Sequence, residues 1–559
     1  MRPSSHRPAH APPPRPTIAA AAPAVALALP AAAPAAQVVE ARPPSDPVAV
    51  DGGRVAGTLL PSGVRAYLGI PYAAPPVREL RWRAPQAPAS WRGVRNADRL
   101  PPDCPQPLRA HDTNHYGGAQ TTSEDCLYLN VWAPTTVAAG EPVPVVVWVH
   151  GGGGAIGSSA MPLYDGEPLA RKGVVYVSFN YRLGALGGLA HPELTAESAH
   201  GASGNYADLD MIAALRWVQR NAGRFGGDPA NVTVMGQSFG SMAVGRLQAS
   251  PLARGLLHKV VGMSGGPFER RTATSAPATL ADAERSGVEF QAALGAGTLA
   301  ALRAVPADRI VAAARQPRRP YVDGHVLPQA PEAIFARGEQ SDVPLLVGHT
   351  RDEVLGGPLG CVRGVADFRR VAVGLYGDAG GAALLRLYPA RTDDEARRQA
   401  LRAGADAGFG LMTRDWMRAQ LERGRAPVYS YLFAREHPYA PGVAFADFDP
   451  ATAGAYHASE LPYFLGTFAA YDRVRTTRAW TDDDRRLGDE LMDALVAFAR
   501  TGRPTLRGVA WPSYDRAAER RVEIGDGVRV GTFDARRMEL HATAAQPAGP
   551  APACAPPRG

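Results

Sequence analysis

Short runs of apolar residues recur along the middle of the chain, and longer amphipathic stretches separate them. The runs are almost continuously apolar, which is typical of strands that are buried on both faces. They cover residues 143–149, 174–179, 232–235, 259–263, 343–347 and 428–433. Residues 209–222 fit a helix instead, because one helical face collects the large apolar side chains of Met211, Ile212, Leu215 and Val218 together with Ala222.

Strand and helix patterns alternate, which predicts an α/β fold with a large, mostly parallel central sheet flanked by helices. No internal repeat and no linker interrupts the chain between Val48 and about His541. The prediction is therefore one large domain over residues 37–545. A leader over residues 1–36 precedes it, and a Pro/Ala-rich tail over residues 546–559, expected to be disordered, follows it.

The leader has the pattern of a secretory signal peptide. Arg2, Arg7 and Arg15 precede an apolar stretch over residues 17–29, and small residues at 33–35 supply an A-x-A cleavage site. This pattern predicts a secreted protein, and the alternative is a disordered leader that stays attached. No later segment has eighteen uninterrupted apolar residues, so no stable membrane anchor is expected.

The composition excludes several classes of protein. With 45% hydrophobic and 20% charged residues in 559, the chain can bury a large core, so disorder, collagen and a coiled coil are excluded as its main state. The net charge of +7 comes almost entirely from scattered arginines, which argues against a nucleic-acid partner. No Cys/His cluster has zinc spacing, so no metal ion is expected.

A possible nucleophile lies in the sequence Gly236-Gln237-Ser238-Phe239-Gly240. It fits the G-x-S-x-G elbow, in which glycines permit a sharp strand-to-helix turn that exposes the serine hydroxyl. The pattern alone is weak, because Ser264 lies in a second match. Ser238 is favoured because a strand pattern precedes it and a helix-compatible stretch, residues 241–248, follows it. Ser264 runs into Gly265, Gly266 and Pro267, so a buried hydroxyl at a strand end is the better interpretation.

A glycine-rich segment, residues 148–157, follows another apolar strand. Backbone N–H groups in such a loop can stabilise a developing oxyanion. A phosphate-binding loop is the competing interpretation. It fits poorly, because neither nucleotide-binding glycine motif is present there, and no cofactor is expected.

The chain resembles the type-B carboxylesterases, the cholinesterase-like branch of the α/β-hydrolases, over about residues 48–515. The resemblance implies the α/β-hydrolase fold. Besides the glycine loop, the serine elbow and Asp323-Gly324, the matching blocks are LGIPYAAPP (68–76), EDCLYLNVW (124–132), NYRLG (180–184), ALRWVQRN (214–221), FGGDP (225–229), TRDE (350–353), HASE (457–460) and WPSY (511–514).

The resemblance assigns roles residue by residue. It implies that Ser238 is the nucleophile, His457 the general base and acid, and Glu353 the carboxylate that orients the imidazole. The implied oxyanion donors are the backbone N–H groups of three residues: Gly152, Gly153 and Phe239.

Two neighbouring carboxylates compete for the role of the orienting acid. Asp352 is adjacent to Glu353, but the family motif places the acid at the second position. Glu460 is more readily explained as structural.

Cysteines are expected to pair in an exported protein. Cys104 and Cys126 are the expected pair, and they also match the family's first disulfide. Whether Cys361 pairs with Cys554 stays open.

The sequence departs from the family pattern at four positions. Gly154 stands where an aromatic residue is common, which is expected to widen the substrate pocket. Gln237 stands where Glu is common and removes a negative charge beside the nucleophile. Phe239 replaces Ala, and Val354 replaces Gly.

The resulting prediction is a secreted serine carboxylesterase that acts on a small-molecule ester. Lipase, amide, carbamate and thioester substrates stay open, as does the oligomeric state. Choline esters are disfavoured, because Tyr116 is the only aromatic residue between Cys104 and Cys126. A binding module that has lost its activity is the alternative from another class.

Overall fold

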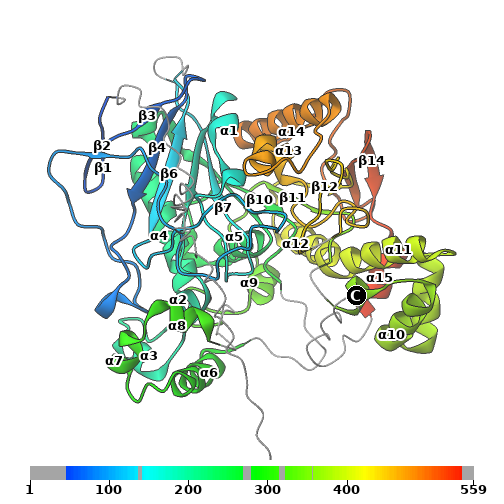
Figure 1. The fold of residues 1–559 in the computed structure, drawn as a ribbon, viewed down its shortest axis with the longest axis horizontal. Helices are drawn as coiled ribbons and strands as arrows, with labels where there is room; N and C mark the ends of the chain where they lie inside the picture. The colour runs from blue at the N-terminus through cyan, green and yellow to red at the C-terminus, as the bar shows by residue number, and fades with distance from the viewer. Residues whose placement is uncertain are drawn as a thin grey trace, which may run out of the picture. The chain divides into compact units, whose positions relative to one another are not determined.

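An eleven-stranded sheet forms the centre of the molecule (Figure 1). This computed structural model describes residues 46–135, 141–268, 278–313, 321–354, 357–447 and 449–543. The strands are β1 (Val48–Val50), β2 (Gly53–Ala56), β3 (Thr58–Leu59), β4 (Arg65–Pro71), β5 (Val94–Asn96), β6 (Tyr128–Ala133), β7 (Val143–Val149), β8 (Val175–Phe179), β9 (Gly227–Gln237), β10 (Lys259–Met263), β11 (Leu345–Thr350), β12 (Val428–Phe433), β13 (Arg520–Ile524) and β14 (Val528–Thr532).

The order of the large sheet is β14-β13-β12-β11-β10-β9-β7-β8-β6-β4-β3, and β1, β2 and β5 form a separate small sheet. Every pair from β13 to β8 is parallel, and the outer pairs are antiparallel. The predicted fold class, a mostly parallel sheet flanked by helices, is confirmed.

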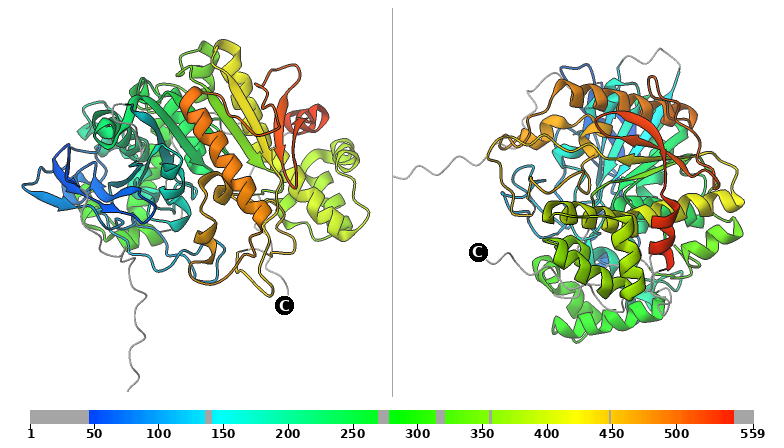
Figure 2. Two further views of the ribbon diagram at one scale, coloured as in Figure 1. Left: turned by 90° about the horizontal axis from the view of Figure 1, so that it is seen from above. Right: turned by 90° about the vertical axis from the view of Figure 1, so that its right-hand side faces the viewer.

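Helices cover both faces of this sheet (Figure 2). They are α1 (Glu167–Arg171), α2 (Gly184–Gly188), α3 (Pro192–Glu197), α4 (Tyr206–Asn221), α5 (Phe239–Ala249), α6 (Leu280–Ala293), α7 (Leu299–Ala304), α8 (Ala307–Ala312), α9 (Pro331–Arg337), α10 (Val365–Leu387), α11 (Asp393–Ala405), α12 (Leu411–Arg423), α13 (Leu461–Leu465), α14 (Asp482–Thr501) and α15 (Ala535–Thr543).

The near-continuous apolar runs are explained by burial on both faces of the sheet. On β7, Val145 and Val147 pack in one core cluster with residues of α4 and α5. Their neighbours Val146 and Trp148 point the other way and pack in a second cluster with residues of α14. Because alternate residues face opposite layers and both layers are apolar, no polar alternation survives in the sequence.

Most of the predicted elements are present, and the strand ends differ most. β7, β10 and β12 have the predicted bounds. β11 was expected at residues 343–347 and lies at Leu345–Thr350 instead. It begins after Pro344, which has no N–H to donate. It continues through His349, a polar residue that interrupts the apolar run but is buried within the sheet.

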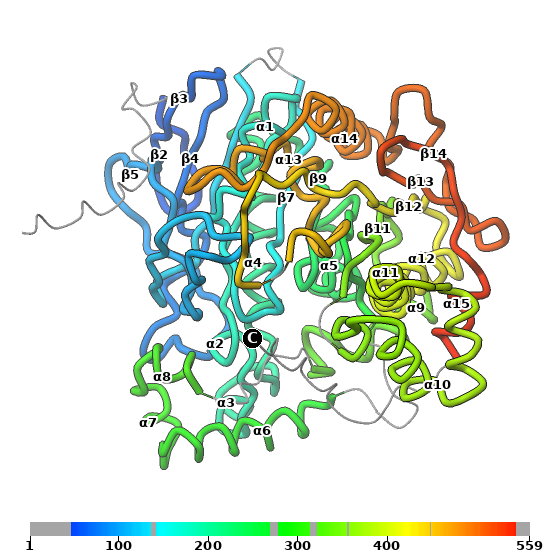
Figure 3. The backbone as a smooth tube through the Cα atoms, turned by 45° about the vertical axis from the view of Figure 1, so that its right-hand side comes forward, coloured from blue at the N-terminus to red at the C-terminus, as the bar shows by residue number. Residues whose placement is uncertain are grey.

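Three helices, α10, α11 and α15, lie together beside the sheet (Figure 3). The hydroxyl of Tyr388, at the end of α10, lies 2.9 Å from Nε2 of His541 on α15 and donates to Asp406 Oδ2 at 2.7 Å. Asp406 begins a π-helical turn, Asp406–Gly410, that joins α11 to α12. Such turns occur frequently at functional sites.

The described residues belong to one compact unit. None of the helices among them is both long enough and apolar enough to span a bilayer. The predicted signal peptide (1–36), the predicted tail (546–559) and Cys554 lie outside the described residues. The predicted domain boundaries therefore stay predictions, and the question whether Cys361 pairs with Cys554 stays open.

Candidate active site

The serine elbow joins the centre of the sheet to α5. Ser238 follows the last residue of β9 and precedes the first residue of α5, with φ 57° and ψ −125°. A non-glycine residue with positive φ costs on the order of 1–3 kcal/mol, and such strain is concentrated at functional sites. The predicted strand–serine–helix order is therefore present, and the helix begins at Phe239 rather than at Ser241.

Both glycines of the elbow are required by close backbone contacts. A Cβ atom at Gly240 would lie 2.1 Å from the carbonyl oxygen of Val149, and one at Gly236 would lie 2.5 Å from the carbonyl carbon of Gly240. The N–H of Ser238 donates to the carbonyl of Met263 at 2.8 Å, which fixes the turn. Ser238 itself is 7% exposed.

The second serine candidate lies in a different environment. Ser264 follows β10, is fully buried, and donates a long hydrogen bond (3.4 Å) to Glu460. No helix follows it within residues 265–268. The structure thus places Ser264 as the expected buried hydroxyl at a strand end.

His457 and Glu353 are brought together from distant parts of the chain. Nδ1 of His457 lies 2.5 Å from Oε2 of Glu353. The other oxygen of this buried carboxylate accepts the backbone N–H of Thr350 at 2.9 Å. Because Nδ1–H donates to Glu353, the neutral imidazole carries its lone pair on Nε2.

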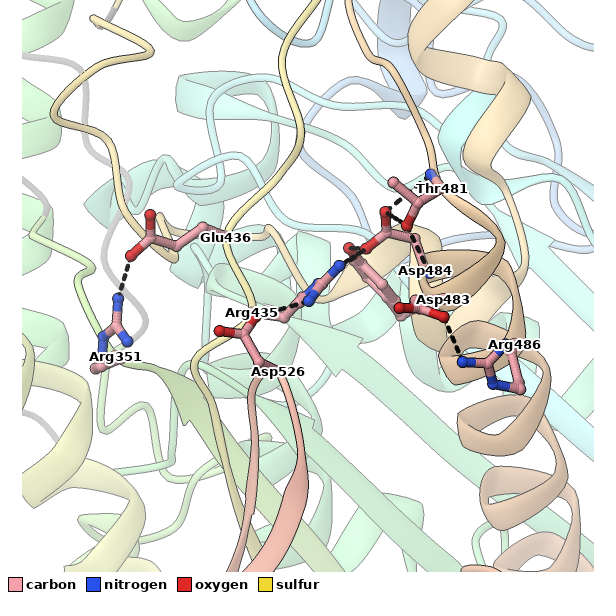
Figure 4. Close-up of polar contacts among 9 residues, drawn as sticks. Arg351, Arg435, Glu436, Thr481, Asp483, Asp484, Arg486 and Asp526 are labelled. Atoms are coloured by element: carbon pink, nitrogen blue, oxygen red, sulfur yellow. Dashed lines mark hydrogen bonds and ion pairs between the residues drawn. The ribbon is translucent and has the colours of Figure 1, made fainter.

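Asp352, the competing carboxylate, hydrogen-bonds to the backbone of the segment that precedes His457 instead of to the imidazole ring of His457. Its Oδ2 accepts the N–H of Ala455 at 2.8 Å, and its own N–H donates to the carbonyl of Ala455 at 3.1 Å. The guanidinium of Arg351 pairs with Asp352 at 2.6 Å. It also pairs with Glu436 at 2.6 Å, as Figure 4 shows. Asp352 therefore anchors the loop that presents the imidazole.

Nε2 of His457 is not hydrogen-bonded to Ser238 anywhere in the described structure. Its neighbour is the side-chain amide of Gln237, whose Nε2 lies 3.1 Å away. The sequence predicted only a change of charge at position 237, and no sequence pattern predicted this contact. Ser238 follows Gln237 directly in the chain, so the Gln237–His457 contact brings the three triad candidates to one site.

The glycine loop lies directly against the elbow. A Cβ atom at Gly151 would lie 3.1 Å from Cβ of Ser238. Gly152 and Gly153 have φ values of +105° and +63°, and within the described residues no hydrogen bond uses their N–H groups. The N–H of Phe239 belongs to the first turn of α5, where N–H groups lack helical partners. Two of the three predicted oxyanion donors, the N–H groups of Gly152 and Gly153, thus have no hydrogen-bond partner among the described residues, and the third belongs to the residue that follows Ser238.

The Cys104–Cys126 disulfide closes a loop that contacts both halves of this site. Gln106 in this loop exchanges two hydrogen bonds of 2.8 Å with the backbone of Gly157, at the end of the glycine loop. His115 lies 3.4 Å from the hydroxyl of Tyr471, in the region that packs around the segment before His457. Among the described residues, no group of three or more His, Cys, Asp or Glu side chains is arranged as a metal site.

Comparisons with known proteins agree on one family. A model of the Carboxylesterase family matches residues 44–361 and 368–542. Fumonisin B1 esterase from Sphingopyxis macrogoltabida is 36% identical over 466 residues, which cover 80% of this chain and 82% of that protein. Para-nitrobenzyl esterase from Bacillus subtilis (strain 168) is 35% identical over 484 residues, which cover 83% of this chain and 91% of that protein.

A solved structure of PNB esterase matches with a TM-score of 0.71 and 32% identity, over 89% of this chain and 99% of that one. The chain belongs to the carboxylesterase family. It is a carboxylesterase, and it hydrolyses esters by the serine-hydrolase mechanism.

Two departures of this carboxylesterase from its family pattern lie side by side. A Cβ atom at Gly154 would lie 2.8 Å from Cζ of Phe239, so the ring of Phe239 occupies the space beside Gly154. This ring also stacks on Tyr181 at 6.3 Å and lies under the guanidinium of Arg246 at 5.1 Å. The expected widening of the substrate pocket at Gly154 stays a prediction.

Phe409 is a site residue of the carboxylesterase that the sequence analysis missed. Its ring stacks on the imidazole of His457, with the centroids 4.9 Å apart and the planes 13° from parallel. It comes from the π-helical turn Asp406–Gly410, 48 residues before His457. The only local signal was an aromatic residue flanked by Gly408 and Gly410, which by itself predicts no contact with histidine.

Glu460 is fully buried and close enough to Glu353 to interact with it electrostatically. Burial, and then the nearby charge of Glu353, raise the pKa of Glu460 above its usual value. A raised pKa favours the neutral acid, so Glu460 adds little negative charge beside Glu353. This agrees with a structural role for Glu460.

Acid should destabilise the carboxylesterase through its buried histidines. Desolvation lowers the pKa of His115 and His349 to about 3 and that of His150 to about 4. In the unfolded chain histidine binds a proton below about pH 6.5, and these folded histidines do not, so stability falls as pH drops from about 6.5 toward 4. Each histidine contributes up to about 1.4 kcal/mol per pH unit.

His349→Phe tests this expectation, because neither ring nitrogen of His349 has a partner among the described residues. We expect the thermal unfolding midpoint of the variant to fall less between pH 7 and pH 5 than that of the parent protein. An equal fall in both proteins would remove His349 from the explanation.

Proposed function

We propose that Ser238, His457 and Glu353 are the catalytic triad of this carboxylesterase, with Gly152, Gly153 and Phe239 as oxyanion donors. The observation that carries the proposal is the convergence of the His457–Glu353 pair, the strained serine elbow and unoccupied backbone N–H groups at one edge of the sheet. The order Ser, Glu, His along the chain is the one this fold uses.

In the proposed mechanism, Oγ of Ser238 attacks the ester carbonyl while Nε2 of His457 takes its proton. The backbone N–H groups stabilise the negative oxygen of the tetrahedral intermediate, at about 2.7–4 kcal/mol for each good donor. Glu353 stabilises the imidazolium. The intermediate collapses and releases the alcohol with the proton from His457. Water then attacks the acyl-enzyme in the same way and releases the acid.

The pH dependence of kcat/KM tests the role of His457. We expect the rate to rise with pH as the imidazole loses the proton that blocks Nε2. His457→Gln should lose this acid limb together with most of the activity. His258→Gln is the matched control, since His258 binds the N–H of Val232 at the opposite end of the strands. An acid limb that survives in His457→Gln would assign the base elsewhere.

We propose a soluble small-molecule ester as the substrate. The relatives include esterases named for fumonisin B1, for para-nitrobenzyl esters and for cocaine, so membership of the family leaves the acyl and alcohol groups undefined. A panel of esters that varies acyl length and alcohol size would define both groups. Strong activation by emulsified triglyceride over soluble esters would instead indicate a lipase.

Export of the protein is also proposed, on the basis of the leader pattern and of the Cys104–Cys126 disulfide, a bond typical of oxidising compartments. We expect the mature protein recovered from the medium of producing cells to begin near Ala36 or Gln37. Intact-mass measurement checks this, and an uncleaved Met1 terminus inside the cells would contradict it.

A further inference from the structure

Gln237 contacts the one nitrogen of His457 that the mechanism needs. It is the last residue of β9, it is 3% exposed, and its amide nitrogen lies 3.1 Å from Nε2 of the imidazole. An amide nitrogen can only donate. Nε2 therefore accepts this hydrogen bond, in agreement with the proton on Nδ1 that donates to Glu353.

The glycine loop holds the Gln237 side chain in place. A Cβ atom at Gly151 would lie 2.9 Å from Oε1 of Gln237 and 2.8 Å from its backbone oxygen. The side-chain oxygen thus packs against a backbone that only glycine allows, and the amide nitrogen is left facing the imidazole. The contact is therefore made by a buried side chain packed against the glycine loop, not by a surface side chain.

A neutral imidazole has a single lone pair at Nε2, and this lone pair is also the one that must accept the proton of Ser238. Within the described residues, the Gln237 amide uses it and the Ser238 hydroxyl does not. We propose that Gln237 is a positioning residue that holds the resting imidazole neutral with Nε2 engaged, and that this hydrogen bond is released when His457 accepts the serine proton. The inference rests on the catalytic roles proposed above for Ser238 and His457.

Among the described residues, Gln237 is the group that contacts Nε2, and the other groups around the imidazole act elsewhere on the ring. Glu353 is the carboxylate at Nδ1, and Phe409 covers one ring face. His115 interacts electrostatically with His457, and burial lowers the pKa of His115 to about 3, which keeps it neutral at the pH of an assay. Glu460 interacts with Glu353, and the raised pKa of Glu460 favours its neutral form.

Variants at position 237 should therefore shift the acid limb of kcat/KM in a defined order. Gln237→Met removes the donor that favours the neutral imidazole, so the midpoint moves to higher pH by a few tenths of a unit to about one unit. Gln237→Glu places a carboxylate that favours the imidazolium, so the midpoint moves further, by about one to three units. On the alkaline plateau, Gln237→Met should equal the parent enzyme or exceed it by up to about tenfold, because no hydrogen bond has to be released.

The experiment measures kcat/KM for a p-nitrophenyl ester from pH 5 to pH 10 for the parent and both variants, with thermal unfolding to verify folding. Gln219→Glu is the control, since Gln219 lies on α4 and binds the carbonyl of Leu256. The expected order of midpoints is parent, Met, Glu, with the control unchanged. Coincident midpoints, a shift of the Glu variant to lower pH, or a plateau of the Met variant more than threefold below the parent overturn the inference.

Labelling of Ser238 by a fluorophosphonate, measured on the same samples, separates this inference from the proposed function. If the label maps to Ser238 in the parent and in both variants but the midpoints coincide, only the role of Gln237 fails. If Ser238 is not labelled in the parent, the proposed triad fails first, and the role of Gln237 fails with it.

Discussion

Ser238→Ala should lower kcat for a p-nitrophenyl acyl ester by about a million-fold. Without the hydroxyl no acyl-enzyme forms, and only the oxyanion donors and substrate binding remain to accelerate hydrolysis. The alanine fits the elbow, where the conformation of residue 238 is fixed by the Ser238–Met263 backbone hydrogen bond and by the close contacts of both glycines. The loss should therefore appear without a large change in thermal stability.

Ser264→Ala is the matched control for this experiment. Ser264 lies in the second G-x-S-x-G match and shares the positive φ of the elbow, at 52°. Within the part of the chain that the structure describes, its hydroxyl makes only a long hydrogen bond to Glu460, so its loss should change kcat by no more than about tenfold. Activity of Ser238→Ala within tenfold of the parent, or a large loss in Ser264→Ala alone, would mean that the wrong serine was chosen.

Glu353→Gln should lower kcat by about ten-thousand-fold. A glutamine cannot stabilise the imidazolium by charge, and its amide N–H₂, if turned toward Nδ1, favours the tautomer with the proton on Nε2. That tautomer cannot accept the proton of Ser238. Measurement of kcat with a saturating ester separates this effect from substrate binding.

Asp352→Asn distinguishes the two adjacent carboxylates. The asparagine oxygen can still accept the N–H of Ala455, while the ion pair with Arg351 is lost. We expect a lower thermal unfolding midpoint and a kcat within about tenfold of the parent. A larger catalytic loss in Asp352→Asn than in Glu353→Gln would make Asp352 the orienting acid.

The central sheet could be predicted from the sequence because its strands are buried on both faces. Val143–Val149 is apolar at successive positions whose side chains enter different core clusters, and the pattern is visible without knowledge of its neighbours. The ends of β11 were missed, because His349 and Thr350 are polar residues inside the sheet. A buried polar residue is a tertiary property that a local pattern does not reveal.

For a similar reason, the sequence predicted some residues of the candidate site and missed others. Ser238 is part of a local turn whose glycines follow from backbone contacts, so its motif points to it directly. Glu353 and His457 are 104 residues apart and carry no local signal of their own, so they were identified only through the family resemblance. The contacts of Gln237 and Phe409 with the imidazole depend on how a strand end, a π-helical turn and the segment at His457 meet, and no sequence pattern predicted them.

Labelling of the intact protein with a fluorophosphonate, followed by mapping of the modified peptide by mass spectrometry, tests directly whether Ser238 is the nucleophile. We expect one phosphonyl group per chain, attached to Ser238, and no labelling of Ser238→Ala. Modification of a different residue, or equal labelling of Ser238→Ala, would contradict it.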